Sequence, residues 1–282
     1  MAGLLGRYRP WAVCLSLLLP ALLFMSGAFI APLAKLLQLS LSDPRGTFAA
    51  YDEILGSAVY RRVLLHTLST ALGVTAISIV LASPTAFLLT RLKGARLQFA
   101  FWCVLAPLWI SVLVRTFSWM LLLERNGPIN RLLHAVGLTT APLKLLFNDT
   151  GVYIGMVHVL LPYAVLPIYA ALVRIDARLV LASEGLGAGP LMTFRRVYLP
   201  LCLPGVAAAA VLVFLLALGF FITPALLGGS NLTVAMLIES LVDERLAWPL
   251  AGAASFVLLT ATLTLLVMTA RLVPLRRLMG GR

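Results

Sequence analysis

The sequence predicts an all-α membrane protein with about six transmembrane helices, and three observations lead to this fold class. The 282 residues are 61% hydrophobic and 11% charged, whereas soluble domains are nearer half apolar and a quarter charged. The apolar residues fall in runs of about 20, the length that a helix needs to cross a bilayer. Short basic segments separate several of these runs. A soluble fold of this size could not bury so much apolar surface, so the bilayer must serve as part of the solvent.

The apolar runs define the predicted elements of a single membrane domain, residues 1–282. No low-complexity linker or internal repeat divides the chain. The six predicted spans are residues 11–33, 64–89, 97–123, 151–173, 204–227 and 248–273.

The first run follows Arg7 and Arg9, as in a secretory signal peptide. A signal peptide, however, has an apolar region of only about 7–15 residues. We therefore expect the first run to be a retained helix. The second and third runs are joined by a very short basic loop, and the third contains one charged residue, Arg115.

The fourth run contains His158, together with Pro162 and Pro167, which can kink a helix. His158 has two readings, a packed interior histidine or a proton relay. Beyond the fifth run, an acidic group could attract a cationic solute or dock a binding protein, or it could be an ordinary solvated loop. This group consists of Glu239, Asp243 and Glu244.

The distribution of basic residues predicts the orientation of the chain. If the N-terminus is cytoplasmic, the cytoplasmic segments contain 13 of the 22 basic residues but only two of the ten acidic residues, Asp176 and Glu184. Lys and Arg accumulate on the cytoplasmic side of membrane proteins, so both termini are expected there. The 13 residues are Arg7, Arg9, Arg91, Lys93, Arg96, Arg174, Arg178, Arg195, Arg196, Arg271, Arg276, Arg277 and Arg282.

Composition and missing motifs exclude several function classes. The net charge of +12 follows from the topology pattern, so nucleic-acid binding is not expected. There is no GxxxxGK[ST] phosphate-binding loop, no HExxH and no GxSxG. We expect no metal site, no cofactor in this chain and no catalytic residues, hence no enzyme activity. Acidic residues are essentially missing from the spans, which argues against a proton-driven antiporter.

The loop at 174–203 is the most informative segment, and it reads LVLASEGLGAGPLMTFRRVYLPL over 179–201. Its first half has helical spacing of apolar residues. Three glycines then interrupt the helix, and Pro190 favours the start of a second short helix. The pattern predicts two short helices around a glycine break, lying at the membrane surface.

This loop resembles the cytoplasmic EAA loop of ABC importer permeases that depend on a solute-binding protein. The matching residues are Ala182, Gly187, Ala188, Phe194, Arg195, Val197, Leu199 and Pro200, and Ser183 and Pro190 belong to the same loop. Two positions depart from the family pattern. Its acidic residue falls at Leu181, and its second alanine falls at Ser183, which puts in doubt a salt bridge made by that acid.

The resemblance extends from about residue 66 to 271 and is nearest to the spermidine/putrescine-type permeases. Four further stretches support it: SPTAFLLTRLKG at 83–94, APLWISVLVRTFSWMLLLERNGPIN at 106–130, LLPYAVLPIYAAL at 160–172 and FFITPALLGGSNLTVAMLIESLV at 220–242. Related permeases also carry opines, iron or other small organic solutes.

The resemblance implies a type I importer bundle in the bacterial inner membrane, in which residues 174–203 form a coupling helix. The implied partners are an ATPase subunit that binds ATP, a second permease, a periplasmic or extracellular solute-binding protein and membrane lipid. The chain would then be half of a pore for a small organic solute, with a polyamine-like compound as the first candidate. The alternatives are another solute, such as an opine or iron, or a stand-alone secondary transporter.

Arg115, followed by Trp119, is the candidate residue of the solute pathway. A charge at membrane depth is costly and usually faces a cavity or a partner. The other reading is an arginine that snorkels to the outer interface, with Trp119 in the aromatic belt. Both readings stay open at the level of the sequence.

Overall fold

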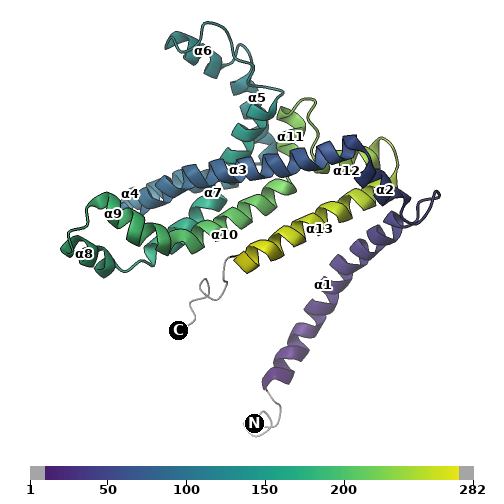
Figure 1. The fold of residues 1–282 in the computed structure, drawn as a ribbon, viewed down its shortest axis with the longest axis horizontal. Helices are drawn as coiled ribbons and strands as arrows, with labels where there is room; N and C mark the ends of the chain where they lie inside the picture. The colour runs from purple at the N-terminus through teal and green to yellow at the C-terminus, as the bar shows by residue number, and fades with distance from the viewer. Residues whose placement is uncertain (1–9, 273–282) are drawn as a thin grey trace.

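A computed structural model describes residues 10–272, with side chains described over 15–269. All regular elements in this range are helices (Figure 1). Five of the predicted cytoplasmic basic residues lie outside the described residues: Arg7, Arg9, Arg276, Arg277 and Arg282.

Five helices are long and apolar enough to cross a membrane, and there are six candidate spans if a bent pair of helices counts as one span. This confirms the predicted fold class. The five helices are α1 (Pro10–Ser40), α3 (Ala58–Arg91), α7 (Asp149–Val173), α10 (Leu199–Leu218) and α13 (Trp248–Leu272). The bent pair is α4 (Gly94–Trp109) with α5 (Val112–Leu123), where the chain turns by 100°.

Two predicted spans are therefore broken, which corrects the expectation of continuous helices at 97–123 and 204–227. The first break lies at Ile110 and Ser111, whose backbones are extended with ψ of 134° and 137°. The second follows Gly219, after which the chain restarts as the short helix α11 (Ile222–Leu227). Hydropathy does not reveal either break, because the apolar residues continue through both.

The core of the bundle is formed by α3, α7 and α10, which lie side by side along most of their length (Figure 1). Close approach of α7 and α10 depends on Gly205. A Cβ atom at this position would lie 2.4 Å from Ala171 Cβ and 2.8 Å from the Pro167 carbonyl oxygen. Because interiors are packed as tightly as organic crystals, the two helices could not keep their spacing around a larger side chain.

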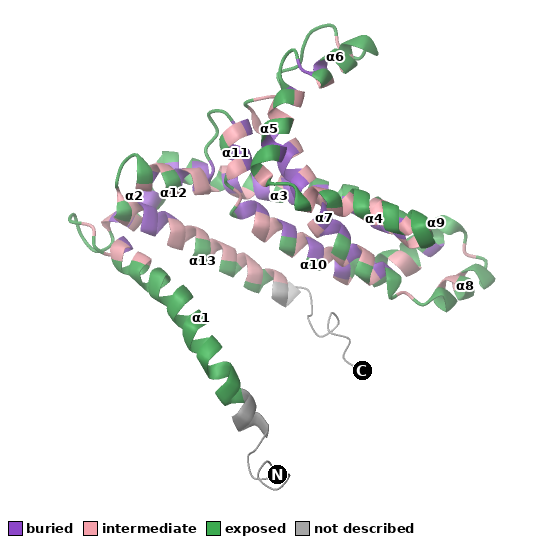
Figure 2. Ribbon diagram, turned by 180° about the vertical axis from the view of Figure 1, so that it is seen from behind, coloured by how far each residue is buried: buried purple, intermediate pink, exposed green. Residues whose placement is uncertain are grey.

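Helix α1 stands apart from this core and touches the bundle mainly near its C-terminal end, against α13 (Figures 1 and 2). There, Ser40 donates to the Leu37 carbonyl and shares a 2.8 Å hydrogen bond with the Tyr51 hydroxyl. None of the apolar window of α1 is buried within the chain. Lipid or another chain must cover this helix.

A second apolar cluster caps the end of the bundle where α3 begins. It joins α2 (Ala49–Gly56) and α12 (Val234–Asp243) to the start of α13. The preceding loop is fixed by Arg45, which donates to Asp43 at 2.8 Å and to Glu53 at 2.6 Å. The hydrogen bonds that Asp43 accepts from Arg45 lower the pKa of Asp43 to about 2, so Asp43 stays ionised over the physiological pH range.

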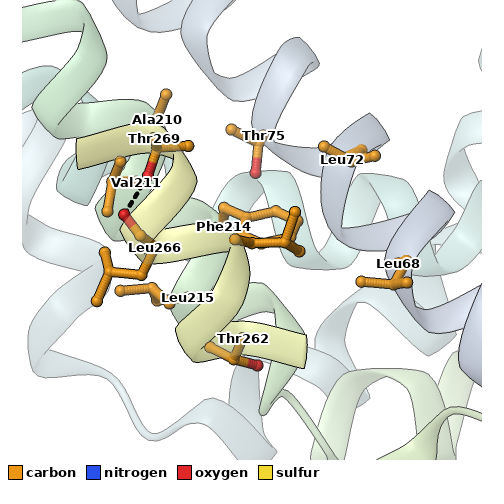
Figure 3. A pocket seen from close by; sticks show the side chains of 11 residues that line it. Leu68, Leu72, Thr75, Ala210, Val211, Phe214, Leu215, Thr262, Leu266 and Thr269 are labelled. Carbon is orange, nitrogen blue, oxygen red and sulfur yellow. Dashed lines mark hydrogen bonds between the residues drawn. The ribbon is translucent and has the colours of Figure 1, made fainter. Parts of the chain in front are cut away.

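An apolar hollow of about 290 Å³ lies between α3, α10 and α13 (Figure 3). Leu72, Phe214 and Leu266 line it, and its threonines satisfy their hydroxyls within their own helices. Thr75 donates to the Ala71 carbonyl at 2.7 Å. The hollow therefore offers no free polar group to a hydrophilic solute, and it suits an apolar side chain or a lipid chain.

Replacing Gly205 by valine should destabilise the bundle, because the new side chain overlaps α7. Overpacking of this kind costs roughly 1–3 kcal/mol, so the thermal midpoint of the purified protein should fall by several degrees. The control is Gly27→Val, since no atom lies within 4 Å of a Cβ at Gly27. Equal midpoints for both variants would contradict this packing argument.

Candidate functional site

The segment between α7 and α10 has the predicted arrangement of two short helices around a glycine break. It contains α8 (Ala177–Gly185) and α9 (Pro190–Thr193), and a π-helical turn, Phe194–Tyr198, leads directly into α10. Asp176 caps α8, because its Oδ1 accepts a 2.8 Å hydrogen bond from the Arg178 amide. Pro190 is in the first turn of α9. Proline is favoured there because backbone amides at the start of a helix have no helical acceptor, so its missing N–H costs no hydrogen bond.

Gly187 closes α8 with a left-handed backbone, φ +83°. The turn is held by two hydrogen bonds, from the Gly187 amide to the Glu184 carbonyl at 2.9 Å and from the Ala188 amide to the Ser183 carbonyl at 3.0 Å. A side chain in this conformation costs about 1–2 kcal/mol. The turn thus requires glycine for its backbone, although there is open space around the position.

Ser183 and Thr193 link the two short helices across the glycine break. Their hydroxyl oxygens are 2.9 Å apart, and Thr193 is only 4% exposed. Ser183 stands where the related loops have alanine, so this hydrogen bond is a particular feature of the chain. The sequence pattern did not single out Thr193, because only the fold brings it to Ser183.

Several apolar side chains of the segment point away from the bundle. Leu186 is 88% exposed, Leu191 79% and Leu181 65%. The exposed Arg195 and Arg196 line a surface hollow beside Leu191 and Met192. An exposed apolar patch rimmed by polar residues marks an interaction site.

The predicted loop residues divide by their exposure. Ser183 and Ala188 are partly buried and lie on the inner side of the segment. The exposed residues are Ala182, Gly187, Pro190, Phe194, Arg195 and Pro200. Leu181, at the position of the family's acidic residue, is also exposed.

Phe87 fastens the segment to the end of α3. Its ring meets Phe194 and Tyr198 edge-on, with ring centroids 6.1 Å and 5.5 Å away. Arg91 covers Phe87, with its guanidinium carbon 4.8 Å from the ring centroid. Sequence reasoning missed Phe87, and the only signal was an aromatic residue within the SPTAFLLTRLKG stretch.

The pathway candidates Arg115 and Trp119 lie on α5, just beyond the break. Arg115 is 7% exposed, so it does not snorkel toward solvent within this fold. Trp119 donates its indole N–H to His158 Nδ1 of α7 at 3.1 Å, and His158 is partly buried. Next to Arg115, the hydroxyls of Thr116 and Thr223 are 3.1 Å apart and connect α5 to α11.

At the end of the bundle opposite α8, Asp149 connects the first turn of α7 to two other segments. It accepts a 2.8 Å hydrogen bond from Asn231, and its Oδ1 lies 3.1 Å from His66 Nε2. The acidic residues predicted beyond the fifth run, Glu239, Asp243 and Glu244, lie on or just after α12 and are exposed. Within residues 10–272, no group of three or more His, Cys, Asp or Glu side chains is arranged to hold a metal ion.

Comparison with known families decides the identity of the bundle. A family described as "binding-protein-dependent transport system inner membrane component" matches residues 78–278. The chain belongs to this family. It is therefore a multi-pass inner-membrane permease of an ABC importer, and its relatives are transport components.

Two relatives cover most of the permease. The spermidine/putrescine transport system permease protein PotB of Escherichia coli (strain K12) is 33% identical over 223 residues, which make up 79% of this chain and 80% of PotB. The inner membrane ABC transporter permease protein YdcU of the same organism is 33% identical over 228 residues, covering 76% and 72% of the two chains.

Solved structures show the same fold. A chain of the bacterial alginate ABC transporter, in complex with an alginate pentasaccharide-bound periplasmic protein, has a TM-score of 0.74 and 17% identity and covers 95% of both chains. At this identity, the likeness concerns the fold of the permease alone.

Replacing Phe87 by alanine should loosen the segment 177–198, because both edge-on ring contacts are lost. Aromatic pairs contribute about 0.5–1.5 kcal/mol each beyond their buried area. Amide hydrogen exchange in 177–198 should therefore become several times faster, while exchange in α7 stays unchanged. Phe99→Ala is the control, since Phe99 is 71% exposed. Unchanged exchange in the Phe87 variant would mean that the ring contacts do not hold the segment.

Proposed function

We propose that the permease forms half of the translocation pore of an importer and is driven by a cytoplasmic ATPase subunit that docks on residues 177–198. The single observation that carries this proposal is the preformed apolar surface of α8 and α9. Leu181, Leu186 and Leu191 are exposed on a segment that is nevertheless held in shape by Ser183, Thr193 and Phe87. A rigid projecting patch is suited to receive force from a partner.

The connection to the pore supports the same proposal. A displacement of α9 by the partner would be transmitted to α10 through the π-helical turn. It would be transmitted to α3 through the contacts of Phe194 and Tyr198 with Phe87. Both helices belong to the core, so the displacement biases the bundle between two arrangements. The permease itself binds no ATP and catalyses no reaction in this proposal.

The remaining subunits follow from the two ends of the bundle. A second permease completes the pore, and a solute-binding protein delivers solute to the end that carries α2 and α12. The basic residues Arg174, Arg178, Arg195 and Arg196 mark the α8 end as cytoplasmic. Both termini of the permease lie on that side, and lipid surrounds the assembly.

The solute proposed is a small organic cation of the polyamine kind. The support comes from PotB, whose name gives spermidine and putrescine as its cargo. An opine or iron is the alternative. Solute specificity is determined first by the binding protein, because it captures the solute before the pore receives it.

The docking proposal is tested by comparing two glycines of the same segment. Both Gly187 and Gly185 have open space for a Cβ, but only Gly187 has a positive φ. Gly187→Ala should weaken co-purification of the ATPase subunit roughly five- to thirtyfold, the equivalent of about 1–2 kcal/mol of backbone strain. Gly185→Ala should bind as the wild type does, and Gly187→Asp should bind least.

The measurement is the amount of ATPase subunit retained by tagged permease in mild detergent. If the wild type retains none, the importer assembly proposed here is wrong. If both alanine variants bind equally well, docking does not depend on the shape of the glycine turn.

The solute proposal is tested with the complete importer in proteoliposomes. Spermidine-loaded binding protein should stimulate ATP hydrolysis several-fold over binding protein without solute, because solute delivery and the pore are coupled through residues 177–198. The control is binding protein incubated with an amino acid of similar size. Stimulation by another solute but not by spermidine would reject the polyamine assignment and leave the importer function intact.

A further inference from the structure

Arg115 is a buried charge that the coupling mechanism does not use. It is 7% exposed and sits at the fourth position of α5, directly after the break that separates α4 from α5. Its Nε and Nη1 atoms have no hydrogen-bond partner among the described residues. An unpaired buried arginine is strongly destabilising, so a partner outside the chain is expected.

No acidic side chain forms an ion pair with Arg115 within the described residues. All ten acidic residues lie in the described range, and each falls in a loop, a short surface helix or the first turn of α7. The ion pairs that they form within this range engage Arg45 and His66. Arg115 is therefore a cation without an anionic side chain beside it in the part of the chain that the structure describes.

The groups around Arg115 are donors or neutral hydroxyls. Trp119 can only donate, so His158 accepts at Nδ1, and a neutral imidazole then carries its proton on Nε2. Thr116 donates to the Val112 carbonyl at 2.8 Å and so accepts from Thr223. Tyr163 and His158 lie within electrostatic range of the guanidinium, and neither side chain carries a carboxylate.

The place of Arg115 indicates where the missing group comes from. Non-helical backbone within a membrane span is tolerated only where protein covers it or a water-filled cavity lies beside it. Broken helices in transporters mark the solute pathway or the boundary between repeated units. The helices that follow the two breaks, α5 after Ser111 and α11 after Gly219, are joined by the Thr116–Thr223 hydrogen bond. Arg115 is thus next to the part of the bundle that faces the pore or the second permease.

We propose that Arg115 binds a carboxylate supplied from outside this chain, at the junction of α5, α7 and α11. The guanidinium offers a fork of N–H donors that matches the two oxygens of a carboxylate. A side chain of the second permease can bring this carboxylate. The solute can bring it only if it is an amino-acid-like compound such as an opine, the alternative named above, because polyamines have no carboxylate. The inference rests on the importer function proposed above.

The two sources predict different behaviour. A carboxylate of the second permease makes Arg115 part of the subunit interface, and its removal weakens the assembled pair whatever the solute. A carboxylate of the solute makes Arg115 a specificity residue. Putrescine and ornithine differ by one carboxylate, so they form a matched pair of probes.

The experiment compares the complete importer carrying Arg115→Gln, Arg115→Lys or the control Arg125→Gln, because Arg125 is exposed just after α5. The readouts are the thermal midpoint of the complex, and the uptake of putrescine and of ornithine into proteoliposomes. Each acidic residue in the spans of the second permease is also neutralised, alone and together with Arg115→Gln.

Arg115→Gln should lower the uptake of at least one probe by about tenfold or more, or lower the thermal midpoint of the complex. Arg115→Lys should recover only part of this, since lysine keeps the charge but not the fork. A non-additive effect with one neutralised acid identifies the second permease as the source. Selective loss of ornithine uptake identifies the solute.

The proposal is overturned if Arg115→Gln matches the wild type and Arg125→Gln in complex stability and in uptake of both probes. It is also overturned if the loss is additive with every neutralised acid and equal for the two probes. If the wild type retains no ATPase subunit, the importer proposal fails instead, and that result is read before any Arg115 variant is made.

Discussion

The structure depends on one constraint, the hydrogen bonding of the backbone inside hydrocarbon. An unpaired amide or carbonyl costs several kcal/mol there, so a chain with this composition can cross the bilayer only as helices. The long helices α3, α7 and α10 pair most of their backbone groups internally, although each contains at least one proline, and Gly205 lets α7 and α10 approach closely. The two breaks are tolerated because α5 and α11 pack against each other and join through Thr116 and Thr223. Irregular backbone is thus confined to one region of the bundle.

The opposite requirement holds at the α8 end, where the chain must present an apolar surface without losing its shape. Three local features achieve this: the left-handed turn at Gly187, the Ser183–Thr193 hydrogen bond and the ring of Phe87 between two aromatic neighbours. The first two act within the segment itself. The third connects this surface segment to the core helix α3. Exposed leucines are compatible with this arrangement because the backbone beneath them is held in place.

The sequence was sufficient for the features that depend on local pattern. Run lengths predicted an all-α bundle with five to six candidate spans. The glycines and Pro190 predicted the helix–break–helix form of the loop, since turn chemistry acts over a few residues. Features that depend on residues distant in the chain were out of reach. The breaks lie within apolar runs, Phe87 meets residues more than 100 positions away, and the burial of Arg115 depends on how α5 packs. Snorkelling was therefore a fair alternative for Arg115 until its packing was known.

The gap between α4 and α5 also has a kinetic meaning. A helix that bends during transport must first break amide–carbonyl hydrogen bonds, and in hydrocarbon each such step is slow and steeply dependent on temperature. At Ile110 and Ser111 the backbone is already extended, so α5 can swing relative to α4 without unwinding a turn. Helical hydrogen bonds at this point therefore set no barrier to a change of the angle between α4 and α5. The resistance comes instead from the packing of α5 against α7 and α11.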